Sequence, residues 1–257
     1  MTTLALKLTL APIIVLVAAL AQRRLGPRLG GRIVGFPLTT GPFLAVVSLQ
    51  YGTAAAARAA AGVIAGQMVV VGFCLGYAHL AARVRPLWAL AGALVIGALA
   101  GTAVSAVHPP LLATGAVLVA VILGLYTWPG FQAPARPARP DTVGAVAVRM
   151  AVVGGLVAGL TAAARVVGPY LAGTLSSMPV ILAVVVPATH RHDGPVAATE
   201  VVRGALVSIG SAVIFITVVA YTVDAMDAVL AFALAGVALF VTSLLPWARL
   251  TPARPQP

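Results

Sequence analysis

The chain has 257 residues, of which 61% are hydrophobic and 8% charged, with a formal net charge of +11 and a mean hydropathy of +1.08. A soluble domain has about 45–50% apolar and about 25% charged residues, so this composition excludes an ordinary soluble protein and indicates a polytopic membrane protein. The 16 basic residues are scattered between apolar runs, which favours a role in membrane orientation over nucleic-acid binding. With Cys74 as the only cysteine, an intrachain disulfide and a cysteine-based metal site are excluded.

A transmembrane helix needs about 20 mostly apolar residues, and this length predicts an all-α bundle of about nine spans. The first span resembles a signal peptide, with Lys7 before an apolar run that ends in Ala19-Leu20-Ala21. We expect it to remain uncleaved, because four arginines follow it within ten residues and the run has a counterpart later in the chain. The predicted spans are 4–22, 30–50, 54–79, 87–107, 111–128, 143–164, 169–189, 196–222 and 227–246.

The arginines predict the orientation of these spans, because Lys and Arg in short loops are retained on the cytoplasmic side. With the N-terminus outside and the C-terminus cytoplasmic, the outer side keeps only Lys7, Arg58 and Arg165. The inner side then receives eleven arginines: Arg23, Arg24, Arg28, Arg32, Arg83, Arg85, Arg136, Arg139, Arg191, Arg249 and Arg254.

An internal duplication organises the chain. Three pairs of residues are each separated by 142 positions: Gly26 and Gly168, Pro37 and Pro179, and Gly52 and Gly194. Five predicted spans separate the starts of the two copies, and because five is odd the second copy enters the membrane in the opposite orientation. The predicted organisation is a four-span repeat over 1–110, a linking span with a Pro/Arg-rich inner loop over 111–141, an inverted repeat over 142–250 and a tail over 251–257.

The second span of each repeat contains helix-breaking residues, over 35–42 and 173–179. Proline removes a backbone hydrogen bond and clashes with the preceding turn. A matched pair of broken helices indicates a transporter binding site, although a pair of purely structural kinks has the same signature. Gln67, in the middle of the third span, either lines a cavity or makes a helix-to-helix hydrogen bond. The candidate substrate-binding residues are therefore Pro37, Thr39, Thr40, Gly41, Pro42, Gln67, Ser176, Ser177 and Pro179.

Three ionised side chains are predicted at similar depth near the inner side: Arg149, Glu200 and Arg203. An ionised side chain at a helix centre costs about 2.5–3.5 kcal/mol on insertion scales, so partners are expected. Glu200 and Arg203 share a helix face at a spacing of three, and Arg149 is a candidate third member from a neighbouring span. The group is either a coupling or substrate-contacting site, or a structural ion pair at the inner membrane edge.

Other site chemistry is weak in this sequence. The run His190-Arg191-His192-Asp193 has two alternating histidines, and we interpret it as a solvated inner loop. No phosphate-binding glycine loop, metalloprotease pair or nucleophile elbow is found. We therefore expect no catalytic residue, no metal site, no cofactor and no enzymatic activity.

The run Leu-Ala-Gly-Thr-Leu-Ser-Ser-Met-Pro-Val over 171–180, followed by Gly194 and Arg203-Gly204, resembles the signature of small bacterial inner-membrane proteins of the GlpM type. The first copy resembles that signature more faintly, through Leu29-Gly30-Gly31, Pro37 and Gly52. Proteins of this type are about one repeat long, so the chain resembles a fused, inverted pair of them. The resemblance implies this architecture and a bacterial inner-membrane location, and it assigns no substrate and no active residue.

These observations predict a secondary transporter of a small solute, with its site at the two interrupted helices. The alternatives are a non-transporting scaffold or accessory protein of the bacterial envelope and a translocase of a lipid-linked substrate. The expected partners are the lipid bilayer and a small solute, without nucleic acid, and homo-oligomerisation is left open.

Overall fold

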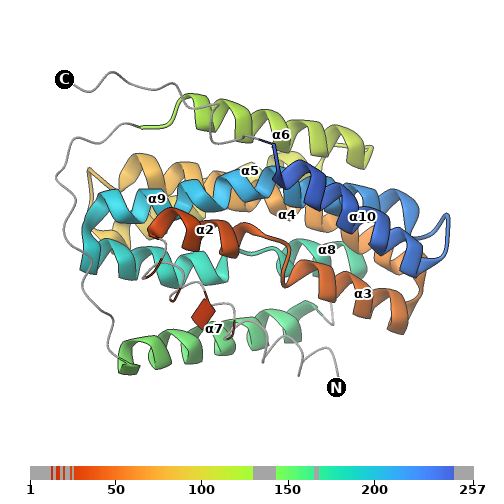
Figure 1. Ribbon diagram of the computed structural model, residues 1–257, viewed down its shortest axis with the longest axis horizontal. Coiled ribbons are helices and arrows are strands. Elements are labelled where there is room, and N and C mark those ends of the chain that lie inside the picture. The colour runs from red at the N-terminus through yellow and green to blue at the C-terminus, as the bar shows by residue number, and fades with distance from the viewer. Residues whose placement is uncertain are drawn as a thin grey trace.

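The computed structural model describes residues 26–129, 143–164 and 168–245, together with five single positions before residue 26. The predicted linker beyond Pro129, the tail over 251–257 and nearly all of the predicted span 4–22 lie outside the described residues. All the regular elements in the described part are helices (Figure 1), which confirms the all-α prediction. They are α2 (Pro27–Gly35), α3 (Thr40–Tyr51), α4 (Thr53–Leu80), α5 (Pro86–Ser105), α6 (Pro110–Tyr126), α7 (Val143–Ala164), α8 (Gly168–Ser176), α9 (Val180–Thr222) and α10 (Ala228–Ser243).

Four helical segments are long and apolar enough to cross a membrane, and they indicate a membrane protein. They are Pro27–Tyr51, Thr53–Leu80, Pro86–Ser105 and Gly168–Thr222. Three further apolar helices are shorter: Pro110–Tyr126, Ala147–Leu156 and Ala228–Ser243.

The prediction of nine spans is not confirmed by these seven segments. The helices α6 and α10 contain 17 and 16 residues. A helix that spans a bilayer needs about 20 residues, so both are shorter than a typical transmembrane helix. The predicted spans 169–189 and 196–222 fall within the apolar segment Gly168–Thr222, on either side of the non-helical Gly194.

The helix α9 consists of two arms, because Gly194 has a non-helical backbone, with φ 89° and ψ 176°. The ribbon reverses direction within α9 (Figure 1), so that the arm before Gly194 and the arm after it lie side by side. The run 190–193 therefore belongs to the end of the first arm, which corrects the predicted loop. The reversal needs only one residue, because a glycine can adopt a conformation that other residues rarely reach.

The centre of the protein is formed by α4 and the second arm of α9, which contain most of the fully buried residues. Small residues are frequent in both helices, alanine and glycine in α4 and alanine, glycine and serine in the second arm of α9, and small side chains allow helix backbones to approach closely. The surrounding helices α5, α6 and α10 keep large apolar side chains on their outer faces, such as Leu99, Val119 and Phe240. Such outward-facing apolar side chains suit contact with lipid, which is as apolar as leucine.

Candidate functional site

The first predicted interruption lies between α2 and α3, at residues 36–39. Here the N–H of Leu38 donates to the carbonyl of Phe36 at 2.8 Å, which makes a γ-turn around Pro37. In a continuous helix, the Leu38 N–H would reach the carbonyl of Val34 instead. Pro37 itself has no N–H to donate. The break therefore withdraws two successive helical donors from the end of α2.

The second predicted interruption lies between α8 and α9, at residues 177–179. The N–H of Val180 donates to the carbonyl of Met178 at 2.7 Å, and Pro179 between them has φ −76° and ψ 48°. These values are close to those of an inverse γ-turn. The Val180 N–H is thereby diverted from the carbonyl of Ser176, its acceptor in a continuous helix.

The two interruptions have the same backbone hydrogen bonds at positions separated by 142 residues. After each γ-turn the helix resumes at the same step: Gly41 N–H donates to the Pro37 carbonyl at 2.9 Å, and Ala183 N–H donates to the Pro179 carbonyl at 2.7 Å. A repeated irregular backbone is stronger evidence for an internal duplication than a repeated regular helix, because helices are common in any all-α protein. The prolines therefore specify one local structure twice.

Four glycines of the described chain have positive φ, and they form two pairs with the same separation. The first pair, with φ 89° and 79°, precedes α2 and α8, and the second pair, with φ 85° and 89°, ends α3 and the first arm of α9. At Gly26, Gly52 and Gly194 the ψ angle is between 164° and 176°, in a region that is essentially restricted to glycine. The four residues are Gly26, Gly168, Gly52 and Gly194.

Each broken helix packs against the long central helix of the other half of the chain. A methyl group on Gly31 of α2 would overlap the carbonyl oxygen of Val201 in α9, and one on Gly173 of α8 would overlap the carbonyl oxygen of Ala59 in α4. The two contacts are related by the repeat: Gly173 lies 142 positions after Gly31, and Ala59 lies 142 positions before Val201. A contact that exchanges its two partners in this way has the pattern of a twofold-related interface.

A second pair of contacts repeats this pattern. Gly62 of α4 lies against the carbonyl of Tyr170, and Gly204 of α9 lies against the carbonyl of Arg28. The hydroxyl of Thr174 adds a direct bond between α8 and α4, donating to the carbonyl of Gly62 at 3.0 Å. Glycine at these crossings allows the helix backbones to approach closely.

The hydroxyls of the second interruption bond to their own helix. Ser176 Oγ donates to the carbonyl of Gly173 at 2.7 Å, and Ser177 Oγ reaches the same carbonyl at 3.4 Å. The side chain of Ser177 is buried against α4, where a methyl group on Gly66 would lie 2.5 Å from its Cβ. Pro179 is also buried. These residues lie where α8, α9 and α4 meet.

The residues of the first interruption lie toward the second arm of α9. Thr40 is buried, with 4% of its surface exposed, whereas Pro37, Thr39 and Pro42 are half-buried. A methyl group on Gly41 would lie 3.5 Å from the Phe215 ring of α9.

The central helices also contribute buried polar side chains. Gln67 of α4 is 7% exposed, and Ser208 and Ser211 of α9 are 4% and 2% exposed. Ser208 lies beside the end of α2, since a methyl group on Gly35 would be 2.9 Å from its Cβ. The sequence interpretation included Gln67 but overlooked the two serines, whose only signal was hydroxyls inside an apolar helix.

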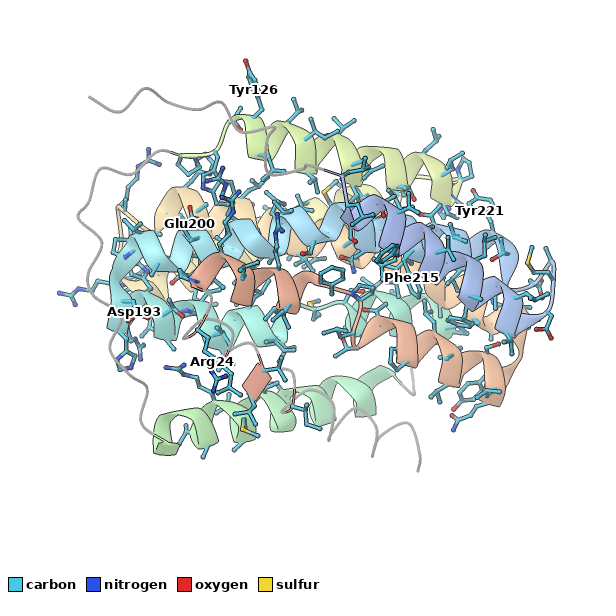
Figure 2. The ribbon with its side chains drawn as sticks, in the orientation of Figure 1. Arg24, Tyr126, Asp193, Glu200, Phe215 and Tyr221 are labelled. Atoms are coloured by element: carbon cyan, nitrogen blue, oxygen red, sulfur yellow. The ribbon has the colours of Figure 1, made fainter. Side chains whose placement is uncertain are left out.

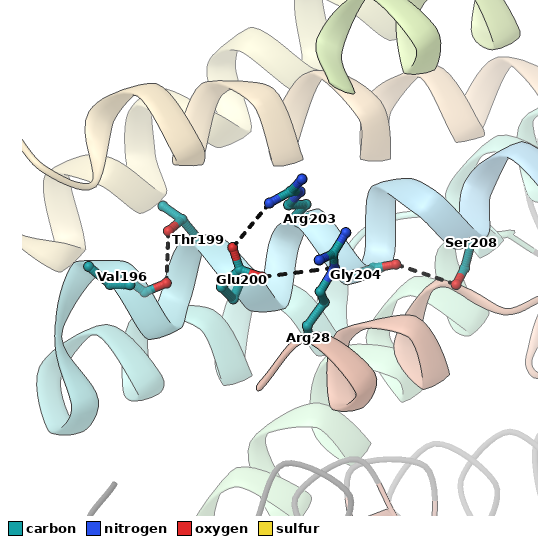
Figure 3. Close-up of polar contacts among 7 residues, drawn as sticks. All are labelled: Arg28, Val196, Thr199, Glu200, Arg203, Gly204 and Ser208. Carbon is teal, nitrogen blue, oxygen red and sulfur yellow. Dashed lines mark hydrogen bonds and ion pairs between the residues drawn. The ribbon is translucent and has the colours of Figure 1, made fainter. Parts of the chain in front are cut away.

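The ionised cluster forms around Glu200 in the second arm of α9 (Figure 3). Arg203 Nη1 donates to Glu200 Oε1 at 3.5 Å, and Arg28 Nε lies 3.9 Å from Glu200 Oε2. The guanidinium of Arg203 also lies 6.0 Å from the centre of the Trp128 ring, within the range of a cation–π contact. Arg28 is a partner that the sequence interpretation used only for orientation.

The third predicted member, Arg149, lies on α7 and is 9% exposed. The structure thus places Glu200 and Arg203 together as predicted, on one face of one helix, with Arg28 of α2 facing them. In Figure 2, Arg24, Asp193 and Glu200 lie at one end of the molecule, and Tyr221 lies at the other.

A buried pair, Tyr77 and His190, was missed by the sequence interpretation. The hydroxyl of Tyr77 in α4 lies 3.0 Å from Nδ1 of His190 in the first arm of α9, and the rings meet edge to face with centroids 5.9 Å apart. The sequence interpretation placed His190 in a solvated inner loop, whereas its side chain is buried at the end of the first arm of α9. Within the described residues, no group of three or more His, Cys, Asp or Glu side chains could hold a metal ion.

No known protein family, curated protein or solved structure matches this chain.

Proposed function

We propose that the protein is a secondary transporter of a small solute, built from two inverted repeats that each contain one broken helix. The observation that carries the proposal is the pair of γ-turns at Pro37 and Pro179. Paired interrupted helices, placed at corresponding points of two repeats, surround the substrate in many secondary transporters.

The chemistry of the breaks supports a binding role. Each γ-turn diverts an N–H from a helical carbonyl, at Val34 in the first break and at Ser176 in the second. Backbone carbonyls of unwound helices coordinate cations or accept hydrogen bonds from a solute. Non-helical backbone is tolerated at membrane depth where it is packed in protein or lines a wet cavity.

The reciprocal glycine contacts support a route to alternating access. Since α2 packs on α9 and α8 packs on α4, each broken helix is attached to the other half of the chain. A small shift of one half against the other would move both breaks together. Exchange of the conformations of the two halves would then open the site to the opposite side of the membrane.

We also propose a bacterial inner-membrane location, with the N-terminus outside and the C-terminus in the cytoplasm. The arginine bias supports this orientation, and the end that contains Arg24 and Glu200 would face the cytoplasm. The likeness to GlpM-type proteins stays a prediction.

The proposal is tested by the reactivity of single cysteines with a membrane-impermeant thiol reagent in vesicles. The background is Cys74→Ala, because Cys74 is the only cysteine and is fully buried. We expect Thr40→Cys and Ser177→Cys to react, although both positions are at most 6% exposed, because an open state must admit water to the breaks. A solute that occupies the site would slow the reaction.

Two control positions calibrate this experiment. Ala225→Cys lies in an exposed turn outside the helices and should react at once, whereas Leu99→Cys, at a position 65% exposed on an apolar outer face, should be protected by lipid. If both break positions stay as inert as position 99 from both sides of the membrane, the transport proposal fails and a scaffold role gains support.

A further inference from the structure

The cluster around Glu200 has more positive charge than one carboxylate can balance. Arg28 and Arg203 both pair with Glu200, and Arg32 lies one turn beyond Arg28 on α2, on the same helix face. Among these four residues, three guanidinium groups and one carboxylate leave an excess of two positive charges.

The arginines of α2 also have buried nitrogen atoms that lack acceptors. Arg28 Nη2 and Arg32 Nε are each shielded from solvent and have no hydrogen-bond partner among the described residues. A buried N–H without an acceptor is destabilising, and the effect is larger for a charged group. Such atoms mark a place where an acceptor would add stability.

The positions of the side chains are held by the surrounding helices. The backbone of Arg28 and Arg32 lies directly on Gly204, and the guanidinium of Arg203 lies near the buried ring of Trp128. Glu200 lies 3.5 Å from Arg203 and 3.9 Å from Arg28, too far for strong charge-assisted hydrogen bonds, which are about 2.7–2.9 Å. Arg28 and Arg32 of α2 therefore retain donors for a stronger acceptor.

We infer that Arg28 and Arg32 bind the phosphate group of an anionic ligand, which replaces the long contact between Arg28 and the carboxylate of Glu200. A phosphate ester carries one to two negative charges and several acceptor oxygens, which match the charge excess and the fork of donors on arginine. Basic sites between membrane helices on the cytoplasmic side bind lipid head groups, and a soluble phosphate ester offers the same chemistry. The inference concerns binding alone and holds whether or not the protein transports a solute.

The test uses the full chain purified in a maltoside detergent, which contains no phosphate. The chain has three tryptophans, so Trp88→Phe with Trp247→Phe leaves Trp128 as a fluorescent reporter beside Arg203. One arm titrates sodium phosphate against sodium chloride at equal ionic strength. The other arm adds phosphatidylglycerol to mixed micelles, with phosphatidylcholine as the matched neutral lipid. A response to phosphate identifies a soluble ligand, and a response to phosphatidylglycerol alone identifies a lipid head group.

We expect Arg32→Gln and Arg28→Gln each to weaken binding roughly tenfold or more, because each removes charged donors to the phosphate. Arg83→Gln is the matched control, since Arg83 is exposed at the same end and donates to the His79 carbonyl at 3.3 Å. Glu200→Gln should tighten binding, because it removes the competing carboxylate. A purely structural ion pair predicts a lower thermal transition and no change in phosphate affinity for this variant.

Three results would overturn the inference: no response to either phosphate source above the chloride and phosphatidylcholine controls, equal binding in Arg32→Gln and Arg83→Gln, or unchanged affinity in Glu200→Gln. Arg32→Gln keeps both ion pairs of Glu200, so it remains informative even where Glu200→Gln does not fold.

Discussion

The contact between Gly31 of α2 and α9 allows a quantitative test of the reciprocal packing. A methyl group at this position would lie 2.7 Å from the carbonyl carbon of Val201 and 3.0 Å from its Cα. Carbon atoms make their best contacts at about 3.5–4.0 Å. Because the obstacle is helix backbone, α2 must move outward by roughly 1 Å to admit the methyl group.

We expect Gly31→Ala to lower the free energy of unfolding by about 1–3 kcal/mol, the usual effect of overpacking. The same change raises stability by about 0.5–1 kcal/mol where space is free, because alanine is the better helix former. Gly236→Ala in α10 is the matched control, since no atom lies within 4 Å of the added methyl group. Gly173→Ala should resemble Gly31→Ala, because its methyl group meets the Ala59 carbonyl in the counterpart contact.

The assay can use Cys74, which is buried and is the only cysteine of the chain. A thiol-reactive fluorogenic dye then reports thermal unfolding in detergent. About 2 kcal/mol corresponds to a transition roughly 4–8 °C lower in a protein of 150–250 residues. If Gly31→Ala and Gly173→Ala unfold at the temperature of Gly236→Ala, the close packing of the broken helices is refuted; a loss in only one of them would refute the reciprocity.

Three further predictions use the same assay. Gly52→Ala should lower the free energy of unfolding by about 1–3 kcal/mol through backbone strain alone, because φ is 85° and no atom lies within 4 Å of the added methyl group. Gly194→Ala, with φ 89°, should be at least as destabilising. Unchanged transitions for both variants would contradict the turn geometry. Tyr77→Phe should cost about 1–3 kcal/mol by leaving the buried ring nitrogen of His190 unpaired, and an unchanged transition would show that the hydrogen bond contributes nothing. Asp227→Ala should lower the free energy of unfolding by about 1 kcal/mol, because the carboxylate of Asp227 caps α10 by accepting from two backbone N–H groups at 2.9 and 3.2 Å. Asp227→Asn should restore most of this loss. Equal transitions for the two variants would argue against the cap.

The sequence by itself determined the local features of this protein. The apolar composition required helices, and the helix interruptions at Pro37 and Pro179 followed from the loss of a donor and the clash of the proline ring. The shared separation of Gly26 with Gly168 predicted a repeated backbone, and the four positive-φ glycines have that separation. Each of these features depends on residues that are neighbours in the chain.

Only the tertiary structure decided which residues meet across helices. Arg28 contacts Glu200 from a helix more than 160 positions earlier, and Tyr77 reaches His190 across a separation of 113 positions. Gly31 likewise packs against the backbone of Val201, which is far from it in the sequence. Hydropathy and turn residues describe a helix but not its rotation or its neighbours, because many helices in a membrane bundle present similar small, apolar faces. The phosphate site that we infer depends on such contacts between helices. The paired interruptions depend on local sequence, and they could therefore be predicted without the tertiary structure.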